Sequence, residues 1–108
     1  MTDRELLELA AKAAGYKIYP VSLDDGLPII CFIVKNKYGG YSRWSPLTDD
    51  GDALRLAVRL DITVGQYKNF SFAYHEGDEE SEEHGDDKQA ATRRAIVRAA
   101  AEIGRNMQ

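Results

Sequence analysis

Cysteine is almost absent from this sequence, since Cys31 is the only one among its 108 residues. A lone thiol cannot form a disulfide within the chain, so a small secreted scaffold held by disulfides is excluded. Cys31 lies inside an apolar run, where cysteine usually serves as a small hydrophobic side chain. We therefore predict a buried, reduced thiol in a protein of a reducing compartment.

Long hydrophobic runs are missing as well. The longest apolar run, Leu27–Val34, has eight residues, whereas a membrane-spanning helix needs about 20. The first residues, Met-Thr-Asp-Arg-Glu, carry charges and no apolar signal core, so no export signal is predicted. We expect a cytoplasmic protein with no membrane contact.

Motifs for catalysis and cofactor binding are also lacking. The sequence has no Gly-x-Ser-x-Gly elbow, no Walker loop and no Gly-x-Gly-x-x-Gly fingerprint. His75 and His84 lack a second His or Cys at zinc-ligand spacing. The aspartates at 24–25 and 49–52 are explained by turn and helix-cap chemistry. We predict no catalytic residue, cofactor or metal site; a small-ligand or metal-binding enzyme built on carboxylates and His84 is an alternative.

Acidic charge is concentrated in one stretch. Eight of the 18 acidic residues lie in residues 76–87, which contain no Lys or Arg, so ten acidic and all 14 basic residues lie elsewhere. Such a charge block buries little apolar surface, and we predict a flexible acidic loop over residues 76–87. Cation binding, docking of a basic partner and mimicry of nucleic acid are the functional alternatives for this loop.

Three helices are predicted from apolar spacing and end signals. Thr2 and Glu5 form a capping box, Gly15 is typical of a helix end, and Asp49 is one of three possible caps for the second helix. The helices are predicted over Asp3–Ala14, about Asp50–Leu60 and about Asp87–Gly104. The residues expected to face the core are Leu54, Ala57 and Val58 in the second helix, and Thr92, Ile96, Ala99, Ala100 and Ile103 in the third.

Five strands are predicted, over Tyr16–Val21, Leu27–Val34, Tyr41–Trp44, Ile62–Gln66 and Phe70–His75. Leu27–Val34 is apolar at successive positions and follows an Asp-Gly turn, which predicts a central strand covered on both faces. The element order is α-β-β-β-α-β-β-α. It predicts a single domain over residues 1–108, of the α/β (α+β) class. Its expected architecture is a three-layer α-β-α sandwich around a mainly antiparallel sheet.

An aromatic and basic cluster is the candidate binding site. Tyr38, Tyr41, Arg43 and Trp44 surround the second hairpin, and Trp, Tyr and Arg dominate protein interfaces. Two alternatives stay open: the rings stack on nucleic-acid bases, or Trp44 and Tyr41 cap the core. Arginines on the third helix form a basic stripe, but the acidic net charge of −4 argues against nucleic acid.

Three segments resemble a known family. Trp44–Leu56, with its Trp-x-Pro-Leu-x-Asp-Asp run, is similar to the phage α-β-α (ABA) sandwich domain family, together with Thr2–Gly15 and Ala91–Gly104. The resemblance implies a phage or prophage accessory protein with a three-layer fold and no assigned reaction. It also implies that the cytoplasm is that of a bacterial host cell. We expect a non-catalytic protein-binding or adaptor domain with a host or phage protein as partner, and a homodimer is possible. An enzyme and a weak nucleic-acid binder are the alternatives.

Overall fold

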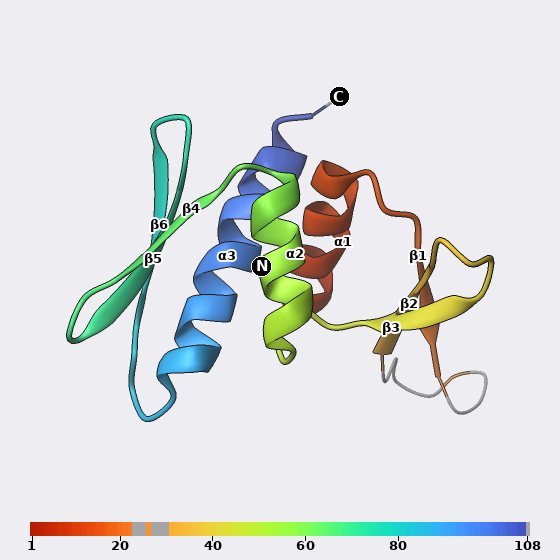
Figure 1. Cartoon of the computed structure of the whole chain (residues 1–108), viewed down its shortest axis with the longest axis horizontal. Coiled ribbons are helices and arrows are strands. Elements are labelled where there is room, and N and C mark those ends of the chain that lie inside the picture. The colour runs from red at the N-terminus through yellow and green to blue at the C-terminus, as the bar shows by residue number, and fades with distance from the viewer. Residues whose placement is uncertain (23–25, 27–30, 108) are drawn as a thin grey trace.

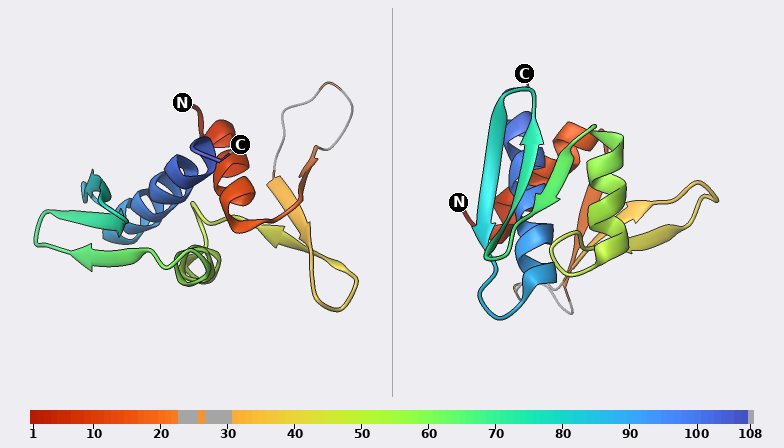
Figure 2. Two further views of the ribbon diagram at one scale, coloured as in Figure 1. Left: turned by 90° about the horizontal axis from the view of Figure 1, so that it is seen from above. Right: turned by 60° about the vertical axis from the view of Figure 1, so that its left-hand side comes forward.

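The protein was analysed as a computed structural model that describes residues 1–22, 26 and 31–107. Within these residues it is a compact α+β domain of three helices and two three-stranded antiparallel sheets. The α+β class and the antiparallel pairing are confirmed. The three-layer sandwich is not confirmed, because the strands form two sheets and the helices lie between them (Figures 1 and 2).

The three helices begin at polar caps. Helix α1 (Asp3–Ala14) starts at Thr2, whose hydroxyl accepts from the Glu5 amide, and ends at Gly15 with φ +76°. Helices α2 (Asp50–Arg59) and α3 (Lys88–Arg105) start at aspartates that accept the same kind of bond. Short polar side chains satisfy free amide groups at a helix start, which is why these ends were predictable from sequence.

Helices α1 and α3 form the closest helix pair. The contact is built from small residues, since Ala10, Ala14 and Ala100 are all buried. At Gly104 the two backbones approach so closely that an added Cβ would overlap the carbonyl group of Leu9. The alanine-rich α3 therefore allows backbone-level packing in the middle of the molecule.

Helix α2 faces the core with a different side from the one predicted. Leu54 and Val58 are 62% and 68% exposed, whereas Ala53, Leu56 and Ala57 are buried. The predicted inward positions of Leu54 and Val58 are thus wrong. Positions 53, 56 and 57 share one face of a helix, and its small alanines let Leu56 reach the core. A helix with apolar residues on several sides does not reveal from sequence which side is buried.

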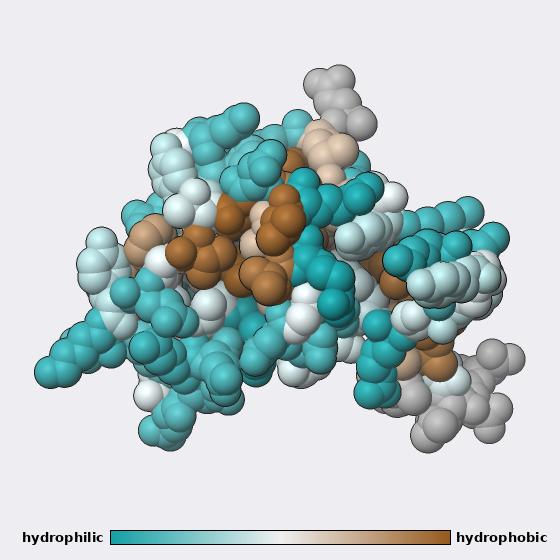
Figure 3. All heavy atoms as spheres, viewed as in Figure 1, coloured by the Kyte–Doolittle hydropathy of each residue, from teal (hydrophilic) through white to brown (hydrophobic). Residues whose placement is uncertain are grey.

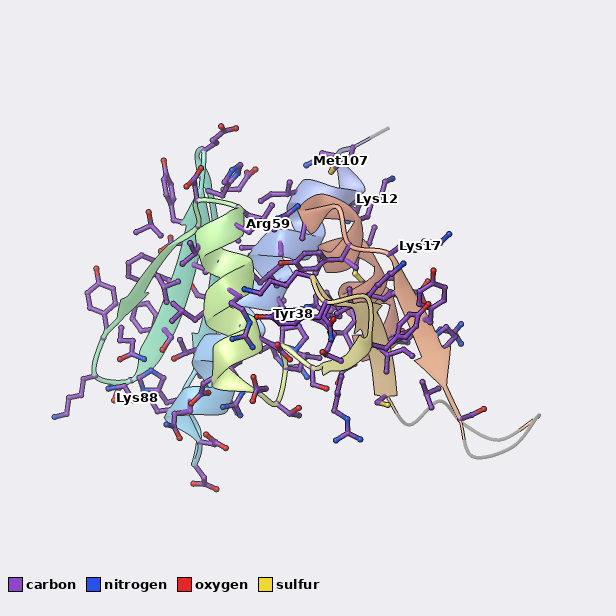
Figure 4. All side chains as sticks on the ribbon, turned by 45° about the vertical axis from the view of Figure 1, so that its right-hand side comes forward. Lys12, Lys17, Tyr38, Arg59, Lys88 and Met107 are labelled. Carbon is purple, nitrogen blue, oxygen red and sulfur yellow. The ribbon has the colours of Figure 1, made fainter. Side chains whose placement is uncertain are left out.

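Arg59 joins the end of α2 to the end of α1 (Figure 4). Its Nε donates to the carbonyl oxygen of Ala14, and its guanidinium lies 5.0 Å from the centre of the Tyr16 ring. A cation near the last carbonyl of a helix is favourable. The contact fixes α2 beside α1.

The first sheet consists of β1 (Ile18–Val21), β2 (Cys31–Lys35) and β3 (Tyr41–Trp44), in the order β1-β2-β3. Residues 27–30 of the predicted central strand and Asp25 of its turn lie outside the described part of the chain. Strand β2 is central in its sheet, as predicted, but the expected cover on both faces is wrong, because Phe32 and Val34 face the core whereas Ile33 lies between Tyr19 and Arg43 on the outer side. Cys31 is only half-buried, so the buried thiol is a wrong prediction.

Two aromatic residues attach the first sheet to the helices. Phe32 and Trp44 are paired across β2 and β3, and they are 6% and 4% exposed. The Tyr16 ring meets the Trp44 ring edge-on, with 6.0 Å between ring centres. These large side chains fill the space between the sheet and α1, and they hold the strands at a distance from the helices.

The second sheet consists of β4 (Thr63–Gln66), β5 (Phe70–His75) and β6 (Asp78–Glu83). Strand β6 pairs with the whole of β5, from Phe70 opposite Glu83 to His75 opposite Asp78. The predicted acidic loop over residues 76–87 is therefore wrong for this segment. A two-residue turn with φ +46° at Glu76 and +93° at Gly77 makes a tight hairpin.

Small side chains attach the second sheet to α3. Ser71 and Ala73 of β5 have no exposed surface, whereas Tyr74 on the other face is 43% exposed. Glu80 and Glu82 of β6 lie on the same inner face and hold Arg98 of α3 at 2.8 and 2.9 Å. Alternate acids thus face either α3 or water, which explains how an acidic run forms a strand.

Candidate protein-binding surfaces

The predicted aromatic and basic cluster is divided by the first sheet. Trp44 is buried, while Tyr38 and Tyr41 are 85% and 57% exposed and Arg43 is exposed. Successive residues of a strand point to opposite faces, so Tyr41 and Arg43 lie on the face that Trp44 does not share. The core alternative is confirmed for Trp44 and wrong for Tyr41. The interface prediction thereby loses its largest residue.

Residues that the sequence did not single out complete the exposed part of this cluster. The Tyr19 and Tyr41 rings meet edge-on at 5.9 Å, and Lys17 Nζ lies 5.9 Å from the Tyr19 ring centre. Lys35 is opposite Tyr41 in the strand register. Figure 4 shows Lys17 extending away from the helices. We call this outer side of the first sheet the basic face: Lys17, Tyr19, Lys35, Tyr41 and Arg43.

The outer side of the second sheet is aromatic and acidic. Phe70, Phe72 and Tyr74 of β5 alternate outward, opposite Glu83, Ser81 and Glu79 of β6. Tyr67 stacks on Phe70 at 4.8 Å between ring centres and is 56% exposed. We call this surface the acidic face, made of Tyr67, Phe70, Phe72, Tyr74, Glu79 and Glu83. Its strand alternation was readable from sequence for β5 but not for β6.

An apolar groove separates α2 from the second sheet. Leu54 and Val58 form an exposed ridge on α2, and Val64 of β4 is 38% exposed beside it. The hollow between α2 and β4 has a volume of about 260 Å³, and Ile96 of α3 also lines it. Figure 3 shows hydrophobic side chains gathered over α2 and the neighbouring strand. We call this surface the α2–β4 groove.

Polar groups border one end of the α2–β4 groove. Arg93 of α3 binds Asp50 of α2 at 2.6 Å, and both residues line the hollow. One turn further along α2, Arg55 donates to Asp52 at 2.7 Å, and this hydrogen bond raises the pKa of the Arg55 guanidinium. The groove is therefore an apolar hollow with a fixed ion pair at its edge.

A serine and a histidine that are distant in sequence meet beside β5. Ser71 Oγ lies 2.8 Å from His84 Nε2 and 2.8 Å from Thr92 Oγ1, and Gln66 donates to the Thr92 hydroxyl. A serine beside a histidine is the pairing used in nucleophilic catalysis. Ser71 has no exposed surface, however, so a substrate cannot reach its hydroxyl. The hydrogen bond between Ser71 and Thr92 attaches β5 to α3.

Neither metal binding nor a basic stripe finds support in the geometry. Within residues 1–22, 26 and 31–107, no three His, Cys, Asp or Glu side chains are placed to hold a metal ion. The predicted arginine stripe on α3 is neutralised by ion pairs. These pairs are Arg93 with Asp50, Arg94 with Asp3, Arg98 with Glu80 and Glu82, and Arg105 with Glu102.

No protein-family model, curated protein or solved structure matches this chain. Its resemblance to the phage family therefore stays an expectation that rests on the three segments named above. None of the helices in the described part of the chain is long and apolar enough to cross a membrane.

Proposed function

We propose that this chain is a non-catalytic protein-binding or adaptor domain that holds an apolar segment of a partner protein in the α2–β4 groove. The observation that carries the proposal is the exposure of Leu54 and Val58, at 62% and 68%, beside an open hollow. Contiguous apolar surface in contact with water is costly, and on folded proteins it marks interaction sites. A phage or prophage accessory role would make a host protein the expected partner.

The alternative functions have weaker geometric support. An enzyme needs a reactive group that a substrate can reach, and the Ser71 hydroxyl is fully buried behind His84. Nucleic-acid binding through the predicted stripe on α3 needs unpaired cations there, and Arg94 and Arg98 are held by carboxylates. The α2–β4 groove instead offers apolar side chains with few charges, which suits a protein segment.

The test is affinity capture from a bacterial lysate with matched variants. Replacing the ridge by Leu54→Gln with Val58→Gln removes apolar surface while keeping the net charge and the helix propensity. Because both side chains are exposed, the urea midpoint should stay near that of the wild type. Loss of two apolar side chains, at about tenfold each, should weaken partner binding about a hundredfold.

Tyr38→Ser is the control, because Tyr38 is exposed at the β2–β3 turn, and this hairpin lies on the other side of the helices from β4 (Figure 1). The proposal requires that wild type and Tyr38→Ser capture the same stoichiometric partner and that the ridge variant does not. Equal capture by the ridge variant, or no partner for the wild type, would contradict it.

A further inference from the structure

The two outer sheet faces carry opposite charge. The basic face presents Lys17, Lys35 and Arg43, and the described residues of β1, β2 and β3 include no Asp or Glu. The acidic face presents Glu79 and Glu83, and β5 and β6 contain no Lys or Arg. Each face therefore has a single sign of charge along its strands. Lys68, in the turn between β4 and β5, lines the same hollow as Glu83 at the end of the acidic face, and the two form no ion pair in the described part of the chain.

Among the described residues, these charges are not neutralised by a charge of the opposite sign. In the part of the chain that the structure describes, Lys17, Lys35, Arg43, Glu79 and Glu83 make no ion pair, whereas six of the seven other arginines are in ion pairs. Unpaired charges of opposite sign on two separate faces favour association between molecules, because complementary patches steer encounter and set orientation.

Both faces also carry exposed aromatic rings. Tyr19 and Tyr41 lie among the cations of the basic face, and Tyr74 and Tyr67 lie beside the carboxylates of the acidic face. Aromatic pairs add attraction beyond their buried area, and a cation over a ring does the same. The two faces are thus complementary in charge, and both carry aromatic rings.

We propose that the basic face of one copy binds the acidic face of a second copy. The two sheets lie on opposite sides of the helices, at the two ends of a molecule that is 42 Å long (Figure 1). Such a contact joins two different surfaces. A pair of bound copies therefore still has one free basic face and one free acidic face, to which further copies can bind. The product is an open row or a closed ring.

A second copy is a better occupant than a single-stranded nucleic acid. Phosphates would satisfy Lys17, Lys35 and Arg43, but the acidic face would repel the same strand, and the net charge of the chain is −4. A copy of this chain satisfies both faces at once. This inference is independent of the α2–β4 groove, because neither face includes Leu54 or Val58.

The test uses two complementary variants in sedimentation velocity at about 0.05 M salt, where charge attraction is weakly screened. Lys35→Gln with Arg43→Gln removes charge from the basic face only, and Glu79→Gln with Glu83→Gln removes charge from the acidic face only, so neither variant gains a new complementary face. All four side chains are exposed, so both variants should keep the wild-type urea midpoint.

The wild type should form species larger than a monomer as concentration rises, and about 0.5 M salt should weaken this association at least about tenfold. Each variant alone should be monomeric. Their mixture should form a one-to-one dimer and nothing larger, because it contains one intact face of each kind.

Several results would overturn the inference. These are a monomeric wild type at low salt, assembly by either variant alone, and no dimer in the mixture. Assembly that survives high salt but is lost in Leu54→Gln with Val58→Gln would assign the contact to the groove. A monomeric wild type that binds an oligothymidine strand through Arg43 would assign the basic face to nucleic acid.

Discussion

The two sheets have the same antiparallel three-strand order but join the helices in different ways. The second sheet presents Ser71 and Ala73 to α3, and its backbone lies close against that helix. The first sheet presents Phe32 and Trp44, which fill a wider space. The size of the inward side chains therefore sets how closely a sheet approaches a helix, while the outward side chains are free to carry opposite charges.

The largest effect is expected from removing the aromatic attachment of the first sheet. Trp44→Ala should lower the free energy of unfolding by about 3–5 kcal/mol, because a large buried side chain leaves a cavity. The measurement is urea unfolding followed by far-UV circular dichroism. Tyr41→Ala is the control, since Tyr41 lies three residues away on the exposed face and its loss should cost about 0.5 kcal/mol or less. Equal losses in the two variants would show that Trp44 does not anchor the sheet.

The next largest effect is expected from a glycine in the second sheet. A Cβ on Gly65 of β4 would overlap the Phe72 ring, which lies over it on the acidic face. Gly65→Ala should therefore cost about 1–3 kcal/mol, because the ring must move.

Gly40 in the β2–β3 turn is the matched control for Gly65. A Cβ there would meet the Asn36 amide at 3.5 Å, an ordinary contact. Thermal unfolding should show a lower midpoint for Gly65→Ala than for Gly40→Ala. The opposite order would mean that Phe72 is not held against Gly65.

The contrast between the sheets also shows what sequence reasoning could reach. Helix ends were predictable because Thr2, Asp49 and Asp87 satisfy backbone groups within a few residues. Strand β6 was not, since its acids are ordered by Arg98, which is distant in sequence. The buried side of α2 was also not predicted, because the burial of Leu56 depends on how the helices pack together and not on the sequence of α2 alone.

The candidate binding surfaces were predicted only in part, because they too combine residues that are distant in sequence. Tyr38, Tyr41 and Arg43 are exposed as a binding cluster requires, but Tyr19 joins them only through the strand register. The α2–β4 groove combines a helix with a strand from the next hairpin, and no local pattern marks it. Contacts between neighbours in sequence could be predicted, whereas contacts set by the arrangement of the sheets could not.

A smaller effect is expected from the buried hydroxyl of the second sheet. Ser71→Ala removes the bonds to His84 and Thr92 and should cost about 1 kcal/mol, the usual net value of an internal hydrogen bond. Ser42→Ala in the first sheet removes one exposed contact with Asn36, so the urea midpoint should hardly change. A Ser71 variant as stable as the wild type would show that the bonds beside β5 contribute nothing to the attachment.

The smallest effect is expected from the ion pairs that join β6 to α3. Arg98→Gln should cost about 0.5–1 kcal/mol at low salt, since Arg98 is 38% exposed and water screens its two carboxylate partners. Arg43→Gln should cost almost nothing, because the exposed Arg43 makes no ion pair with any of the described residues. Added salt should shrink the Arg98 difference and leave the Arg43 difference unchanged, in urea titrations at two salt concentrations. If both variants respond alike, the carboxylates of β6 are not what holds that strand to the helix, and the two sheets differ only in the size of their inward side chains.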